Sequence, residues 1–367
     1  MTPIFWLYAG FITLLCLLLA VDLFWLNRGS HTVSAAKAVR QTAGWVAFAL
    51  AFNAVIFVLY DNHAFGLGSH AFTLAPQPLP QGQLPSLTGI PDDAAAPNPL
   101  MPSGGRDAVI MFTTGYVLEL VLSLDNMMVI AIILTYFNVP SKFQHRVLFW
   151  GIIGAVVLRG IMIILGAELV HRVEWILYLF GAFLLFTAIK LHLTDESAKP
   201  DLEKNYAVRI TRAVVRVSTH YDGPRFLTRV NGALAITPLL LALIVVDVAD
   251  TIFALDSIPA IFGVTKDPFL VLASNCLAIL GLRAIYFAVA AINEKFRYLK
   301  QSMILILGFI GLKMLLPLAA LWPTAKDATG NWDFVLSPIT SLLCIASIMA
   351  GGIIASLLNP QSPPKAE

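Results

Sequence analysis

Long apolar runs, separated by shorter polar segments, recur along the chain from Ile4 to Leu358. A helix that crosses a bilayer needs about 20 mostly apolar residues, and these runs reach that length. The pattern predicts an all-α polytopic membrane protein. Nine spanning helices are expected, at Ile4–Leu26, Gln41–Tyr60, Asp107–Tyr136, Val147–Ala167, Trp175–Leu193, Ala233–Asp256, Asp267–Ala291, Ser302–Leu321 and Phe334–Leu358.

Composition and the placement of charge support a membrane protein. Of the 367 residues, 58% are hydrophobic and 13% are charged, whereas soluble domains carry about 25% charged residues. The net charge of +2 gives no reason to expect nucleic-acid binding. Most Lys and Arg residues fall in alternate loops. The positive-inside rule then predicts a multi-pass protein of the cell inner membrane, with the N-terminus outside and the C-terminus cytoplasmic.

Loops and spans together suggest a division of the chain. We expect two N-terminal helices in 1–60, an external Pro/Gly-rich loop in 61–106, a three-helix unit in 107–193, a basic cytoplasmic loop in 194–232, a second three-helix unit in 233–321 and a ninth helix in 334–358.

The two three-helix units resemble each other. Glu119–Asn126 in the third expected helix and Asp250–Ser257 in the sixth both read as an acid, five residues, an Asp and a small polar residue. The similarity continues in order through two further pairs, Arg159 with Arg283 and Lys190 with Lys313. Each unit has an odd number of helices, so the second is inverted relative to the first. Inverted repeats with a site at their interface are a common transporter plan, although a channel can also be built this way.

Acidic residues at membrane depth form the candidate site. An ionisable group in a bilayer costs a few kcal/mol or more unless it faces a polar interior. The predicted metal ligands are Glu119, Asp125, Asn126, Asp247, Asp250, Asp256 and Ser257. Asp22 and Asn275 could belong to the site or serve only as structural partners. The alternative for the acids is structural ion pairing with Arg159, Arg283 or Lys313.

The spacing of the acids limits the shape of this site. Two residues six apart, such as Glu119 and Asp125, lie about 120° out of register on a regular helix. Either the ligands are spread along a path or the backbone breaks. Pro238 and Pro259 make a broken sixth helix plausible.

The ligand types indicate which ion is bound. Oxygen ligands suit hard cations such as Mg, Ca and Mn, and no His or Cys accompanies the acids within a span. The scattered cysteines Cys16, Cys276 and Cys344 suggest neither a disulfide framework nor a thiolate site. We expect no prosthetic group and no enzymatic activity, with a divalent metal ion as substrate. Because carboxylates also bind protons, metal could be exchanged for protons.

At these residues the sequence resembles the TerC family of integral membrane proteins, and in particular its Alx-like branch of manganese exporters. The strongest stretch is DVADTIFALDSIPAIFGVTKDPFLVLASNCLAILGLRAIYF, from Asp247 to Phe287. The resemblance implies nine spans and export of Mn(II) through the seven predicted ligands. Two departures are Asp247, where that branch is expected to have Glu, and an external loop longer than expected.

A second function remains open. Some members of the family are associated with tellurite resistance or with supplying metal to secreted proteins. The chain could therefore be a non-transporting membrane partner in such a complex. That role would need the basic cytoplasmic loop and could spare the intramembrane acids.

Overall fold

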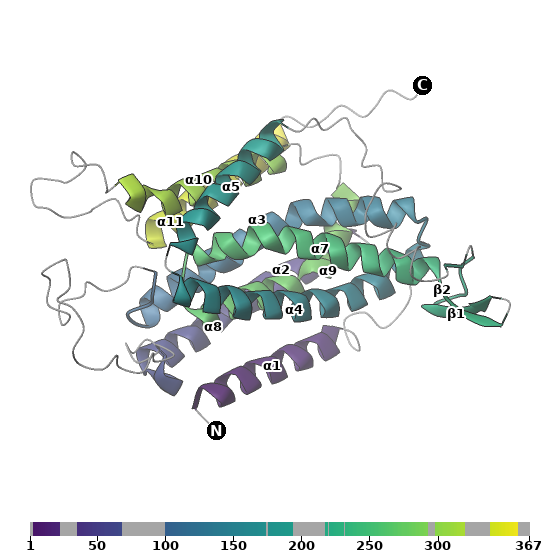
Figure 1. Ribbon diagram of the computed structural model, residues 1–367, viewed down its shortest axis with the longest axis horizontal. Coiled ribbons are helices and arrows are strands. Elements are labelled where there is room, and N and C mark those ends of the chain that lie inside the picture. Colours follow the sequence, from purple (N-terminus) through teal and green to yellow (C-terminus); the bar gives the residue numbers. More distant parts are fainter. Residues whose placement is uncertain are drawn as a thin grey trace, which may run out of the picture.

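The computed structural model describes residues 3–22, 35–67, 100–173, 175–193, 217–218, 220–230, 232–292, 298–319 and 338–358. Most of the expected external loop and most of the basic loop lie outside these ranges. The elements in order are α1 (Pro3–Val21), α2 (Ala35–Asp61), η2 (Ala64–Gly66), α3 (Gly105–Tyr136), α4 (Ser141–Arg172), α5 (Ile176–Leu193), β1 (Leu227–Val230), β2 (Ala233–Ile236), α7 (Pro238–Phe262), α8 (Pro268–Leu280), α9 (Leu282–Ile292), α10 (Leu299–Ala319) and α11 (Pro338–Leu358) (Figure 1).

Apolar helices dominate the described chain. Seven of them, within the described residues, are long and apolar enough to cross a membrane, namely α1, α2, α3, α4, α5, α7 and α11. The protein is an all-α polytopic membrane protein, as the apolar runs predicted. The total of nine spans and the inversion of the repeats stay predictions. Three edges of the expected spans, residues 23–26, 320–321 and 334–337, fall outside the described residues.

Large apolar side chains on the outer faces of the helices are solvent-exposed. Examples are Trp6 at 59%, Leu165 at 64% and Phe186 at 63% exposure. A soluble protein rarely exposes so many large apolar side chains over a contiguous surface. In a bilayer these side chains contact lipid, so the exposure agrees with the membrane assignment.

Helices α5, α10 and α11 gather on one side of the molecule, whereas α1 flanks the opposite side (Figure 1). Helices α5 and α10 approach each other closely at two glycines, which have no side chain to keep the backbones apart. A Cβ built on Gly311 would lie 2.8 Å from the carbonyl oxygen of Gly181, and one built on Gly181 would lie 3.0 Å from that of Gly311. Small residues permit such backbone contact between membrane helices.

The start of the sixth expected span differs from the prediction. Ala233–Ile236 forms strand β2, which pairs antiparallel with β1, and the helix begins only at Pro238. Thr237 is the N-cap, and its hydroxyl accepts from the Leu240 N–H at 3.4 Å. Pro238 has the fixed φ that suits a first helical position. The apolar side chains of β2 therefore extend the hydrophobic run without extending the helix.

The segment just before this hairpin contacts the end of α3 and the start of α4. The Tyr221 hydroxyl donates to the Phe137 carbonyl at 2.6 Å, and the Arg146 guanidinium lies 4.9 Å from the centre of the Phe226 ring. Burial raises the pKa of the Tyr221 phenol above its ordinary value, so the phenol stays a donor at neutral pH. The hairpin thus lies at one end of the helix bundle (Figure 1).

Helix α7 does not contain the backbone break that was considered for the sixth expected span. Both α3 and α7 are continuous, and α7 passes Pro259 near its C-terminal end. The seventh expected span instead divides at Gly281 into α8 and α9. The alternative of a broken sixth helix was therefore wrong. The acids along α3 and α7 lie at different angles on intact helices, as the spread-out alternative requires.

Candidate functional site

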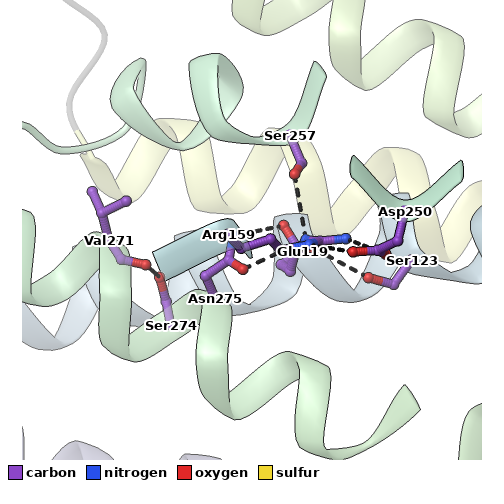
Figure 2. Close-up of polar contacts among 8 residues, drawn as sticks. All are labelled: Glu119, Ser123, Arg159, Asp250, Ser257, Val271, Ser274 and Asn275. Carbon is purple, nitrogen blue, oxygen red and sulfur yellow. Dashed lines mark hydrogen bonds and ion pairs between the residues drawn. The ribbon is translucent and has the colours of Figure 1, made fainter. Parts of the chain in front are cut away.

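Arg159 of α4 is the centre of a buried cluster of charged groups (Figure 2). Its side chain has no exposure to solvent. The guanidinium binds Asp250 of α7 through two hydrogen bonds, Nε to Oδ2 at 3.0 Å and Nη2 to Oδ1 at 2.9 Å. Such a bidentate pair fixes the relative orientation of the two side chains as well as their distance.

The same guanidinium also holds Glu119 of α3. Arg159 Nη1 forms an ion pair with Glu119 Oε1. Two neutral groups complete the surroundings of this carboxylate: Asn275 Nδ2 of α8 donates to Oε2 at 3.2 Å, and Ser123 Oγ donates to Oε1 at 3.2 Å. Glu119 is fully buried. The bonds account for a buried carboxylate that would otherwise be costly.

A close crossing of α3 and α8 brings Asn275 to Glu119. A Cβ on Gly115, one turn before Glu119, would lie 2.9 Å from the hydroxyl of Ser274. Gly115 therefore allows the two helices to approach at this level. Ser257 of α7 and Asn275 each accept a longer contact of 3.5 Å from Arg159 Nη1 (Figure 2).

The cluster joins the two similar motifs. Glu119 and Asp250 hold the same position in their motifs, and both bind one arginine. With both carboxylates counted as charged, the two acids and the guanidinium carry a formal charge of −1 at a site where Glu119 and Arg159 are fully buried and Asp250 is 5% exposed. The structural alternative for these two acids, pairing with Arg159, is realised in this conformation.

Asp247 lies on α7 one turn from Asp250 but faces a different neighbour. Its carboxylate packs against α4, where a Cβ on Gly154 would lie 2.9 Å from Oδ2 and one on Gly151 would lie 3.4 Å from Oδ1. Oδ1 is buried and has no hydrogen-bond partner within the described structure. Two glycines one turn apart on α4 thus make room for this acid.

Asp256 also lies away from the cluster. Its Oδ1 accepts a hydrogen bond of 3.2 Å from Thr187 Oγ1 of α5. Asn126 is buried on α3. The backbone of Asp125 belongs to α3, but its side chain lies outside the described residues. Of the seven predicted ligands, the structure brings together Glu119, Asp250 and Ser257.

The described residues contain no group of three or more His, Cys, Asp or Glu side chains placed to hold a metal ion. The sequence named Arg159 only as one of three possible ion-pair partners of the acids, and it did not single out Ser123 or Thr187. For Arg159 a signal was present, because its match with Arg283 is part of the repeat. Ser123 and Thr187 carry no comparable signal, since polar residues of this kind often only bridge helices.

A second buried arginine makes a separate pair. Arg283 of α9 is 3% exposed and forms an ion pair with Asp22, at the end of α1. Its Nη2 also donates to the Asp22 carbonyl at 3.0 Å. Asp22 is thus a partner of Arg283 in this conformation. Lys313, the third candidate cation, is 9% exposed on α10.

A small cavity of about 20 Å³ lies beside the cluster. Asp250 and Arg283 are the charged residues of its lining, and apolar side chains with Gly151 form the rest. About one water molecule fits in such a volume. Asp250 is thus bonded to Arg159 and shares a cavity with Arg283.

Fold and site together define a class: a polytopic helical membrane protein with a buried cluster of charged groups shared between similar helical units. Residues 104–363 match the Integral membrane protein TerC family, and the chain belongs to this family.

Relatives share most of their length with this chain. An uncharacterized membrane protein of Myxococcus xanthus is 35% identical over 98% of this chain and 95% of its own. The putative membrane-bound redox modulator Alx of Escherichia coli (strain K12) is 40% identical over 86% of each chain. The chloroplastic thylakoid membrane protein TERC of Arabidopsis thaliana is 40% identical over 68% of this chain and 62% of its own. No solved structure matches.

Proposed function

We propose that this protein exports a divalent metal ion, with Mn(II) as the expected substrate, across the cell inner membrane. The observation that carries the proposal is the convergence of Glu119 and Asp250, one from each similar motif, on the buried Arg159. Acids at this depth are functional by default. Their repetition in two motifs favours a shared ion site over isolated structural pairs.

Arg159 then acts as a tethered counter-cation. Two buried carboxylates without a cation would repel each other strongly. The guanidinium compensates them while metal is absent, and a divalent ion that arrives must displace it from at least one acid. Displacement costs hydrogen bonds of Arg159 to Asp250, at 2.9 and 3.0 Å. Only an ion that binds oxygen strongly can offset that loss.

The remaining acids suit a path rather than one compact site. Asp247 packs on α4 and Asp256 on α5, so neither touches Arg159 in this conformation. A metal ion could bind them before or after the central pair. Oxygen ligands favour Mn(II), Mg(II) and Ca(II) over softer ions. Protons released from or taken up by these carboxylates would give exchange of metal for protons.

A redox role is the second candidate, because several relatives carry the name redox modulator. The chain's three cysteines are unpaired and lie on α1, α8 and α11. Cys276 is buried beside Asn275. Separate thiols of this kind do not form a dithiol pair. The cluster of intramembrane charges therefore supports metal transport better.

Flux measurements on purified protein in proteoliposomes test the proposal. Mn(II), Ca(II), Mg(II) and Zn(II) are each offered under proton gradients of both signs. We expect Mn(II) flux, lost in an Asp125→Ala/Asp256→Ala double variant. Glu168→Gln, at an exposed pair with Arg172, is the matched control and should transport normally. Folded protein without flux of any metal would favour a non-transporting membrane partner.

A further inference from the structure

Arg159 and Arg283 occupy matching positions in the two similar units but have different partners. Arg159 binds Glu119 and Asp250, the central acids. Arg283 binds Asp22 of α1, a helix outside both units. The repeat is therefore asymmetric at its buried arginines. In this conformation Arg159, and not Arg283, is bonded to the central acids.

Arg283 is not fully satisfied where it is. Its Nη2 is engaged by Asp22, but its Nη1 is buried and has no hydrogen-bond partner among the described residues. An unpaired donor of a charged group costs free energy when buried. A second arrangement in which Nη1 finds an acceptor would recover that cost.

Arg283 borders the cavity beside the cluster. Asp250 and Arg283 are its charged lining residues, and its volume of about 20 Å³ admits one water. A water there could accept from Arg283 and donate to Asp250. The cavity is too small for a guanidinium group, so direct contact between Arg283 and Asp250 requires α7 and α9 to shift.

We infer that Arg283 is the alternate counter-cation of Asp250, and that Asp22 of α1 withholds it until Arg159 leaves. The inference rests on the proposed function. Transporters built from two repeats work by exchanging the conformations of the repeats, and the exchange of Arg159 for Arg283 at Asp250 would accompany that change. In one half of the transport cycle, metal displaces Arg159 from Asp250. In the other half, Arg283 binds Asp250 in place of Arg159. Asp22 thereby becomes a positioning residue for transport.

A double-mutant cycle tests the exchange without relying on flux. Asp250→Asn and Arg283→Gln are made singly and together in the full chain, with Asp22 present and with Asp22→Asn. Thermal unfolding in detergent gives the coupling between positions 250 and 283. We expect the coupling to be larger with Asp22→Asn, because the freed guanidinium turns to Asp250. Equal coupling in both backgrounds overturns the inference, whether or not the protein transports metal.

Flux provides the second test. Asp22→Asn should slow Mn(II) flux by about 30-fold or more, the scale set by the loss of one partner of a buried charge pair. The exchanged pair Asp22→Arg/Arg283→Asp should recover thermal stability but not flux, since an acid at 283 cannot compensate Asp250. Recovery of both would make the pair purely structural and refute the inference. Wild-type protein without flux refutes the proposed function instead and leaves the coupling measurement to decide.

Discussion

Arg159 of α4 and Asp250 of α7 bind each other through two parallel hydrogen bonds in the interior of the helix bundle (Figure 2). Arg159 follows the first acidic motif along the chain, and Asp250 begins the second. The bond therefore joins two parts of the chain whose sequences resemble each other, at the place where we propose that the transported ion binds. We expect both the stability of the fold and the proposed transport to depend on this contact, and the two can be separated by experiment.

Replacing Arg159 should destabilise the fold strongly. Arg159→Gln leaves Glu119 and Asp250 buried without a cation, and breaking a buried pair in this way costs about 3–5 kcal/mol. We expect a clear fall in the Tm of the detergent-solubilised protein. Arg172→Gln, which breaks the exposed pair with Glu168, is the control and should change little, since surface pairs contribute about 0–1 kcal/mol. Similar Tm values for both variants would contradict a compensated buried cluster.

Sequence patterns predicted the class of fold and part of this cluster. Glu119, Asp250 and Ser257 converge as their shared motif suggested. The sequence could not predict which acids Arg159 binds, because this depends on how α3, α4 and α7 pack. The same holds for Asp256, which faces Thr187 of α5. Angular spacing shows that the acids of one regular helix cannot all face the same binding point. It does not show which neighbouring helix each acid contacts.

The start of α7 and the break at Gly281 were missed for one physical reason. The side chains of β2 are as apolar as those of the following helix, so hydropathy continues across Thr237. Gly281 likewise interrupts a run whose neighbours on both sides are apolar. Hydropathy measures affinity for lipid, whereas a strand or a break depends on backbone hydrogen bonds. Capping by Thr237 and Pro238 is the signal that could have marked the start of α7.

Asp247 should depend on the glycines that face it. A methyl group at Gly154 would lie 2.9 Å from its carboxylate, so Gly154→Ala must shift the acid or the helix. We expect Mn(II) flux to fall by about tenfold or more, because small displacements of a reacting group can cost two orders of magnitude. Initial rates in proteoliposomes measure this.

The control for that change lies on the same helix. Gly160 faces open space, so Gly160→Ala should leave flux unchanged and stabilise α4 by up to about 1 kcal/mol. If both alanine variants transport at the wild-type rate, the contact between Gly154 and Asp247 has no role in transport.

Thr187 should orient Asp256. Thr187→Val keeps the shape of the side chain and removes the donor to Asp256 Oδ1. Loss of one such hydrogen bond is worth about 1 kcal/mol, so flux should fall about fivefold while the Tm changes little. Thr13→Val is the matched control, because the Thr13 hydroxyl binds only the carbonyl of Ala9 on its own helix. A wild-type rate for Thr187→Val would exclude Thr187 as a positioning residue.

The crossing of α5 and α10 should not tolerate a side chain. In Gly311→Ala the new methyl would lie 2.8 Å from the Gly181 carbonyl and 3.0 Å from the backbone nitrogen of Leu185. Backbone atoms cannot move aside as a flexible side chain can, so the helices must separate. Overpacking of this kind costs about 1–3 kcal/mol, and we expect a lower Tm.

Gly308, one turn earlier on α10, provides the comparison for this last change. A methyl group at Gly308 would have no neighbouring atom within 4 Å, so Gly308→Ala should keep or slightly raise the Tm. Opposite shifts for the two variants are expected because helix propensity acts equally on both, while only Gly311 meets α5. A lower Tm for both would mean that the loss comes from α10 itself and that its contact with α5 is looser than the glycine pair indicates.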